Sequence, residues 1–423
     1  MSIADFVNLE GYKVRETFKH LDNGYVLIAV EPLSEQLTCR RCGDHLEGSI
    51  GRHRIKAKYL PIFNYDSFVV CWRRKGHCPT CNKTRSEDLG FLSQDSPHLT
   101  KAFESTIEEL TEIAAVSRVA DYTGEDKSTV WRLDFRRLLR FRSRYKIPPI
   151  THISVDEVYA RKRNREGETR NDRFVTVITD MKSRKVVWVA DSRRREALDE
   201  FYQTLGKERC DAIKVVAQDQ HEDYRASTRE HCPKAAIVYD KFHVIKSFNE
   251  AMNEARKFIL KAFDLKRHEK KKLMGKFKYV LSKSAAKRSD WEKQSLAEAA
   301  KVNELIINLE IIKESVLNLF DHENLNDAEK HFDQLQVWIH ELGFPSLKSW
   351  YNRLASRWDC IAAYYSSPTT SALSEGVNNV IKTLKRRAYG YRNMEYFKLK
   401  IMQICGYLTT DGMRQLSYLE SMA

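Results

Sequence analysis

The chain has 423 residues and carries 72 Lys or Arg against 58 Asp or Glu, a formal net charge of +14 at pH 7. A chain of this length has room for about three domains, and its basic balance favours nucleic acid as a partner over an acidic protein surface. No apolar window approaches membrane-spanning length, and the N-terminal residues lack the regions of a secretory signal. We therefore expect a cytoplasmic protein with no membrane partner.

Two Cys-x-x-Cys pairs stand out among the nine cysteines: Cys39 with Cys42, and Cys78 with Cys81. In a reducing compartment such pairs indicate a metal site rather than disulfides. Four thiolates on two turns suit one tetrahedral Zn2+ ion, which also stabilises a domain with a small apolar core. We therefore predict a structural zinc site in a zinc-ribbon-like domain over residues 1–95, with short strands near 24–30 and 67–72. The nearby histidines are weaker alternatives as ligands: His45, His53 and His77.

Residues 96–147 are predicted to form a helix-turn-helix domain that binds DNA. A short helix ends at Gly124, a polar turn follows, and a second helix begins after Asp126. Hydroxyl groups early in such a helix can contact phosphates or base edges, and arginines can contact the DNA backbone. The residues concerned are Ser128, Thr129, Arg132, Arg136, Arg137, Arg140 and Arg142. The alternative is an ordinary helical hairpin with a solvated basic face.

Between residues 148 and 248, strand-like and helical patterns alternate. Pro148 and Pro149 mark the boundary, and three strand-like runs follow at 153–160, 174–180 and 185–190. A helix, a strand, a second helix, a last strand and a third helix come next. This order predicts the first part of a ribonuclease-H-like α/β core, with an active site across the strand ends.

Three aspartates lie inside or at the ends of these predicted strands. Asp156 lies inside the first strand between apolar neighbours, where its charge is unfavourable unless something such as a divalent cation compensates it. Asp219 ends the fourth strand and is expected beside Asp156, where the two carboxylates would repel without a metal ion. Asp240 ends the fifth strand and is the alternative second carboxylate. With His243, it could instead orient the site or contact DNA, whereas Glu157 should point to the opposite face.

Residues 249–365 show helical patterns without strand-like alternation. Apolar residues recur at intervals of three and four, as in Leu305, Leu309, Ile312, Val316 and Leu319. We predict an all-helical insertion that divides the core. The basic run at 267–279 either binds DNA or forms a solvated helix face.

Residues 366–423 are predicted to complete the core with a helix that becomes strongly basic. Asn379 follows Glu375 by four residues and Lys382 follows it by seven. On a helix the three side chains therefore share one face. We interpret Glu375 as the last ligand of the metal site. The basic residues after it suit a phosphate backbone: Lys382, Lys385, Arg386 and Arg387. The predicted helix cap consists of Thr369, Thr370 and Ser371.

Four sequence features together carry a family resemblance: the two Cys-x-x-Cys pairs, TGEDKSTVWR at 123–132, DKFHVIK at 240–246 and SEGVNNVIKTLKRRAYGYRN at 374–393. On these, the chain resembles bacterial insertion-sequence transposases of the Asp-Asp-Glu type, and more narrowly the group named ISL-three. The resemblance implies a catalytic triad of Asp156, Asp219 and Glu375 that binds two Mg2+ or Mn2+ ions, with Lys382 as a DNA contact. It also implies a homo-oligomer that acts in the bacterial nucleoid on double-stranded DNA, namely terminal inverted repeats and target DNA.

The predicted chemistry also fits the residues themselves. Two metal ions held by carboxylates about 3.5 to 4 Å apart can support in-line attack on a phosphodiester. We therefore expect a transposase that binds the ends of its element, cleaves DNA and transfers strands. The alternatives are a DNA-binding regulator derived from a transposase and a metal-dependent nuclease or resolvase. The presence of all three carboxylates favours an active enzyme over the regulator.

Overall fold

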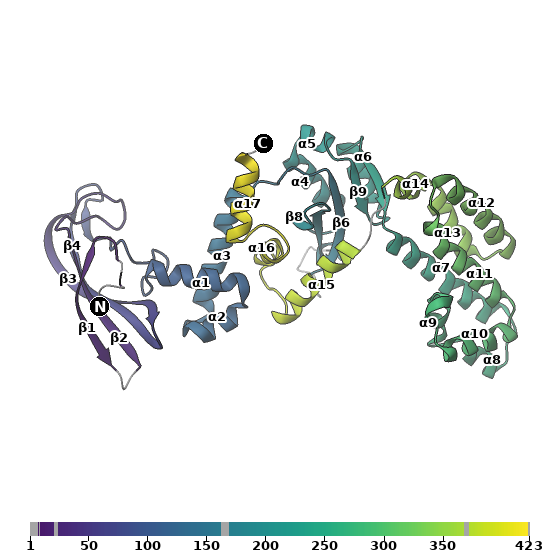
Figure 1. Cartoon of the computed structure of the whole chain (residues 1–423), viewed down its shortest axis with the longest axis horizontal. Helices are drawn as coiled ribbons and strands as arrows, with labels where there is room; N and C mark the ends of the chain where they lie inside the picture. Colours follow the sequence, from purple (N-terminus) through teal and green to yellow (C-terminus); the bar gives the residue numbers. More distant parts are fainter. Residues whose placement is uncertain (1–6, 8, 21–23, 162–168, 368–371, 422–423) are drawn as a thin grey trace. The chain divides into compact units, whose positions relative to one another are not determined.

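The computed structural model describes residues 7, 9–20, 24–161, 169–367 and 372–421 of the chain. The chain forms two compact units, residues 1–144 and residues 145–423 (Figure 1). Within the described ranges, no helix combines the length and the apolar character that crossing a bilayer requires.

Unit 1 begins with a sheet in the order β1-β2-β4-β3, with β5 paired to β4. Its strands are β1 (Tyr12–His20), β2 (Tyr25–Pro32), β3 (Glu47–Ile62), β4 (Tyr65–Cys78) and β5 (Lys83–Ser86). Alternate residues of β2 are buried, including Val26 and Ile28, so one face of the sheet supplies the core. The sequence did not predict β3, because its first half is polar and exposed.

The rest of unit 1 consists of three helices, α1 (Lys101–Ile113), α2 (Val116–Thr123) and α3 (Lys127–Arg144). Gly124 ends α2 with φ of 69°, a left-handed conformation that glycine adopts without strain. Their shared core is apolar and includes Phe103, Ile107, Val119 and Leu133. A short helix, a tight turn and a longer basic helix therefore occupy the segment in which the helix-turn-helix was expected.

Unit 2 contains a five-stranded sheet in the order β10-β9-β6-β7-β8. Its strands are β6 (His152–Tyr159), β7 (Phe174–Asp180), β8 (Lys185–Asp191), β9 (Val215–Gln218) and β10 (Ala236–Tyr239). β6, β7 and β8 pair antiparallel, whereas β6, β9 and β10 pair parallel. The intervening helices are α4 (Arg195–Leu205), α5 (Lys207–Asp211) and α6 (Glu222–His231). The mixed α/β class predicted from the sequence is confirmed.

Two contacts identify which helices cover each face of this sheet. Asp156 of β6 accepts a hydrogen bond from Asn378 of α15 (Ala372–Arg387). Thr176, opposite Glu157 on the neighbouring strand, hydrogen-bonds Tyr224 of α6. Because successive strand residues point to opposite faces, α15 and α6 lie on opposite sides of the sheet.

Two later elements contact the outer strands. α16 (Met394–Ile404) packs on β8, and the backbone N–H of Val186 in β8 donates to Cys405 O at 2.8 Å. α14 (Trp358–Ser366) packs against β10. The chain then ends with α17 (Thr410–Ser421).

Only helices occur in the described chain between β10 and α15 (Figure 1). The α-helices are α7 (Lys241–Ala262), α8 (Arg267–Leu273), α9 (Phe277–Ser282), α10 (Asp290–Val302), α11 (Leu305–Asn318), α12 (Leu325–Leu342), α13 (Pro345–Ala355) and α14, and two short 3-10 helices are η4 (Ala285–Lys287) and η5 (Leu319–Asp321). They enclose a common apolar core, in which the rings of Phe248 and Trp350 meet edge to face at 5.0 Å. The first of these helices, α7, follows β10 directly and begins at Lys241.

Candidate active site and metal centre

A small pocket opens where β6, β9 and β10 carry acidic side chains toward α15. Asp156, Asp219, Asp240 and His243 all line it, together with Ser374 at the start of α15. Val155 of β6 is paired with Gln218 of β9, so the next residue on each strand is an aspartate. Asp156 and Asp219 are therefore brought side by side by the parallel register of two strands.

Asp156 is held by two hydrogen bonds. Its Oδ1 accepts from the backbone N–H of Glu157 and its Oδ2 from Asn378 Nδ2, both at 2.7 Å. Burial raises the pKa of Asp156, and the charge of His243 and these two hydrogen bonds offset only part of that effect. The carboxylate is thus fixed in place in an environment that disfavours its negative charge.

His243 lies between the two other aspartates of the pocket. Its Nδ1 is 3.3 Å from Asp219 Oδ1 and its Nε2 is 4.0 Å from Asp240 Oδ2. Burial lowers the pKa of His243, but the hydrogen bond to Asp219 and the charges of Asp219, Asp156 and Asp240 outweigh burial and raise it to about 9. His243 is therefore a cation at neutral pH, and it holds the pKa of Asp219 below its usual value although burial opposes this.

Asp240 has a second role as the N-cap of α7. Its Oδ1 accepts a hydrogen bond of 2.9 Å from the backbone N–H of Phe242. Burial raises the pKa of Asp240, and the neighbouring Asp156 and Asp219 add to this. Asp240 follows β10, which is one strand further from β6 than β9 is. The cap explains why an acidic residue stands here independently of any metal.

Glu157 is placed on the other face of the sheet, close to the same strand ends. Burial and the charges of Asp219 and Asp156 raise its pKa to about 7. Arg193 is its nearest basic partner, at 3.7 Å.

Glu375 lies on the helix that borders the pocket but does not line it. The face of α15 against β6 carries Ser374, whose Oγ is 2.6 Å from Ser154 Oγ, and Asn378. Adjacent helical residues are about 100° apart around the axis, and Glu375 is exposed. Ser374 and Asn378 were missed by the sequence reasoning. The buried residues Val377 and Ile381 on the same side of α15 would have identified this face.

The basic residues of α15 differ in their surroundings. Lys382, Arg386 and Arg387 are exposed, whereas Lys385 Nζ donates to Tyr159 O at 2.6 Å. The residues expected to cap this helix, Thr369, Thr370 and Ser371, lie outside the described part of the chain.

Most arginines of α3 have acidic or hydroxyl partners within unit 1. Arg132 donates to Ser96 at 3.0 Å, and Arg136 pairs with Asp95 at 2.5 Å. Arg137 is buried between Glu112 and Asp134. Of the two hydroxyl residues at the start of α3, Ser128 is exposed and Thr129 is buried.

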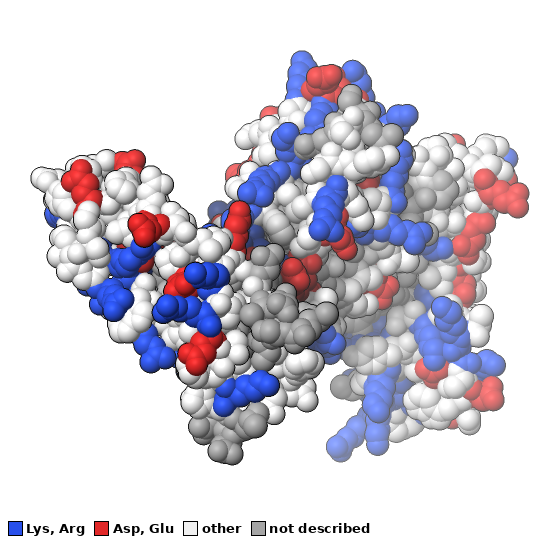
Figure 2. Space-filling view, turned by 60° about the vertical axis from the view of Figure 1, so that its left-hand side comes forward, with Lys and Arg blue, Asp and Glu red and all other residues white. Residues whose placement is uncertain are grey.

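On the face drawn in Figure 2, Lys and Arg side chains are spread over both units with Asp and Glu side chains among them. The positive charge of the chain is therefore not confined to the basic helix α15.

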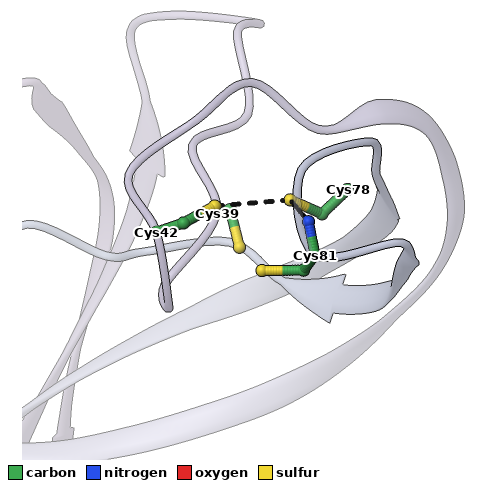
Figure 3. Close-up of side chains that lie close together, drawn as sticks. All are labelled: Cys39, Cys42, Cys78 and Cys81. Carbon is green, nitrogen blue, oxygen red and sulfur yellow. Dashed lines mark hydrogen bonds between the residues drawn. The ribbon is translucent and has the colours of Figure 1, made fainter.

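The four cysteines of the Cys-x-x-Cys pairs converge on one point (Figure 3). Their sulfur atoms all lie within 4.8 Å of one another, and Cys42 Sγ is 3.4 Å from Cys78 Sγ. Tetrahedral zinc with Zn–S bonds of about 2.3 Å requires sulfur atoms about 3.8 Å apart, which this spacing fits. Among described residues, no other group of three or more His, Cys, Asp or Glu ligand atoms is this close. Asp156, Asp219 and Glu375 do not form such a group in this structure.

Backbone N–H groups point at the sulfur atoms of both pairs. Arg41 N lies 3.4 Å from Cys39 Sγ, and Cys81 N lies 3.4 Å from Cys78 Sγ. Burial raises the pKa of Cys39, but backbone hydrogen bonds from Cys42 and Arg41 outweigh it and lower the pKa to about 7. A thiolate is the form that binds metal, so these donors favour the zinc ligand state. The cluster fits zinc binding.

The chain is also similar to known proteins. Residues 153–401, more than half of the chain, match the family model DDE_Tnp_ISL3, described as a transposase. The transposase for insertion sequence element IS1001 of Bordetella parapertussis is 26% identical over 395 residues, covering 93% of this chain and 95% of that protein. The transposase for insertion sequence element IS1557 of Mycobacterium tuberculosis is 24% identical over 419 residues, covering 92% and 90%. The chain belongs to the ISL3-type family of DDE insertion-sequence transposases.

Proposed function

We propose that this transposase cleaves DNA at the ends of its element and joins the ends to target DNA, using Mg2+ or Mn2+ held by Asp156 and Asp219. The observation that carries the proposal is the parallel pairing of β6 and β9, which puts these two carboxylates side by side in one pocket. The strand order β10-β9-β6-β7-β8 supports a ribonuclease-H-like core, which would extend over residues 148–248 and 366–423 around an insertion.

The donor set of the pocket suits a hard divalent cation. Asp156 and Asp219 offer carboxylate oxygens, the ligands that Mg2+ prefers. The raised pKa of Asp156 means that its charge lacks full compensation within the chain. When bound, two such ions would activate a water or a 3′-hydroxyl and stabilise the leaving oxygen. Asn378 would hold Asp156, and His243 would hold Asp219, in the orientation needed for binding.

We propose Glu375 as the third carboxylate. It follows Ser374, which contacts β6, and adjacent residues of a helix are about 100° apart, so α15 would have to rotate to bring Glu375 toward Asp156. Asp240 also lines the pocket and is the rival of Asp219 for the second carboxylate. We prefer Asp219, because Asp240 is engaged as the cap of α7 and lies one strand further from Asp156.

We further propose that the N-terminal parts recognise the ends of the element. A zinc-binding domain at 1–95 and a helix-turn-helix at 96–147 would bind terminal inverted repeats, and the exposed basic face of α15 would contact the backbone. The proposed DNA contacts are Ser128, Arg132, Arg136, Lys382, Lys385, Arg386 and Arg387. Thr129 is left out because its side chain is buried. Two paired ends would require at least two copies of the chain, acting on DNA in the bacterial nucleoid.

The test is Mg2+-dependent cleavage of a duplex that carries the element's end, with binding of the same duplex measured in parallel. Asp156→Asn, Asp219→Asn and Glu375→Gln should each reduce cleavage by at least about 1000-fold while binding stays within about threefold. Asp191→Asn, at the exposed end of β8, is the matched control and should cleave normally.

Asp240→Asn decides between the two assignments. Loss of cleavage in Asp240→Asn, with normal cleavage in Asp219→Asn, would replace Asp219 by Asp240 as the second carboxylate. Normal cleavage by Asp156→Asn would remove the proposed site altogether.

A further inference from the structure

A strongly basic surface lies in the helical segment, and none of its residues lines the pocket. Residues 266–279, here called the insertion tip, contain seven Lys or Arg and one acidic residue among fourteen. The acidic residue, Glu269, is occupied locally, since its Oε2 accepts from the backbone N–H of Lys266 at 2.7 Å. The insertion tip therefore presents an excess of positive charge to solvent.

Two buried side chains and one hydrogen bond anchor the insertion tip to the helical segment. Leu273 of α8 and Phe277 of α9 are buried in the core of the helical segment. Arg256 of α7 donates to the backbone carbonyl of Leu273 and so fixes the turn between α8 and α9. The basic side chains on the outer side are consequently presented by an anchored piece of backbone.

The outer side of the insertion tip is an open groove with both basic and apolar walls. Its volume is about 650 Å³, and it is lined by Leu265, Arg267, Lys270, Lys271, Met274 and Gly275. Met274 is 56% exposed, and Tyr279, close to the groove in sequence, is 63% exposed. An apolar side chain and an aromatic ring at this exposure are free to pack against a partner.

The basic residues here differ from those of α3. In the described chain, no carboxylate pairs with Arg267, Lys271 or Lys276, and all three side chains are exposed. By contrast, Arg136 and Arg137 of α3 each pair with an acidic residue. Lys272 of the insertion tip pairs with Glu298 at 3.5 Å, but the charges of Arg267, Lys271 and Lys276 form no ion pair within the described chain.

We propose that the insertion tip binds the phosphate backbone of double-stranded DNA. Lysines predominate, and a lysine ammonium is a point charge that recognises phosphate without reading a base. The insertion tip and the catalytic pocket belong to the same compact unit, so both can hold parts of one DNA molecule. The inference rests on the proposed function, because DNA is the polyanion on which a transposase acts.

The first experiment measures binding of the full-length protein to a random-sequence 40-base-pair duplex, without divalent metal, at several salt concentrations. The variant Arg267→Gln, Lys271→Gln, Lys276→Gln should bind about tenfold more weakly at 0.1 M salt. For this variant, the slope of log affinity against log salt concentration should be shallower by roughly 0.9 for each lost phosphate contact.

The matched control removes the same charge from the same helical segment. Lys293, Lys301 and Lys330 are exposed and lie outside the insertion tip, and all three are changed to Gln. This control should keep the wild-type salt dependence. Equal affinity and equal salt dependence in both triple variants would overturn the proposal.

A second experiment locates the contact. Tyr279 is replaced by photoreactive benzoylphenylalanine, with Tyr418, which is equally exposed on α17, as the control position. Cross-linking of the duplex at Tyr279 and not at Tyr418 is expected. Cross-links only to protein, or to DNA equally from both positions, would contradict a DNA surface at the insertion tip.

The outcomes separate this inference from the proposed active site. Neither measurement uses cleavage. Normal cleavage by Asp156→Asn would therefore refute the proposed active site without affecting the evidence for DNA binding at the insertion tip. If cleavage depends on metal but the insertion-tip variant binds the duplex as tightly as the control variant does, only the proposal for the insertion tip is refuted.

Discussion

Asn378 on α15 donates a hydrogen bond of 2.7 Å to Asp156 on β6, although the two residues are 222 positions apart. This bond joins the last part of the sheet domain to its first strand across the whole helical segment. It makes the orientation of the Asp156 carboxylate depend on how α15 packs.

Asn378→Ala should lower the rate of DNA cleavage by roughly tenfold or more, because a hydrogen bond to a charged group contributes about 1.5 to 3 kcal/mol. DNA binding should not change. Asn379→Ala is the control, since Asn379 is exposed on the same helix. Equal rates in the two variants would show that Asp156 needs no support from α15.

Replacing Cys39 and Cys42 by Ser should remove bound zinc, because a structural site needs all four ligands. Metal analysis of the purified protein should find about one zinc per chain in the wild type and almost none in the variant. Cys405→Ser alters a cysteine of unit 2 and should retain the metal. A double variant that keeps its zinc would rule out the four-cysteine site.

Arg137→Met should destabilise unit 1 by about 3 to 5 kcal/mol, because it leaves Asp134 buried without its partner. Arg144→Met, at the exposed end of α3, should have little effect. Hydrogen exchange of the α3 amides in the full-length protein measures the loss of stability in both variants. Unchanged protection in Arg137→Met would mean that Arg137 does not support the fold and is available for DNA.

Gly406→Ala should lower the stability of unit 2 by about 1 to 3 kcal/mol. A Cβ at this position would lie 2.5 Å from Val186 O and 2.6 Å from Met402 O, and neither backbone can move easily. Gly376→Ala meets no atom within 4 Å and lies inside α15, so it should be neutral or stabilising. Thermal unfolding compares the two, and equal midpoints would contradict the tight packing of α16 on β8.

The parts that could be predicted from sequence are those set by local spacing. The cysteine pairs, the glycine that ends α2 and the strand pattern around Asp156 each depend on near neighbours in the chain. The rotation of α15 depends instead on Val377 and Ile381 packing on a distant sheet, so Glu375 was expected on the inner face and Ser374 and Asn378 were overlooked.

The arginines of α3 illustrate the same limit. A run of basic residues does not reveal which side chains have an acidic partner, because the partners here come from other segments. Asp95 and Glu112 precede α3 in the chain, and only the folded unit brings them to Arg136 and Arg137. Charge pattern alone cannot distinguish such internal pairs from an exposed surface like the insertion tip.

The two outer strands of the unit 2 sheet already have neighbours from later in the chain, α14 beside β10 and the segment at Cys405 beside β8. The backbone hydrogen bond from Val186 to Cys405 O occupies part of the outer edge of β8. A strand from another molecule could join the sheet at that point only by displacing the segment at Cys405. A later part of the same chain therefore protects this edge against strand addition.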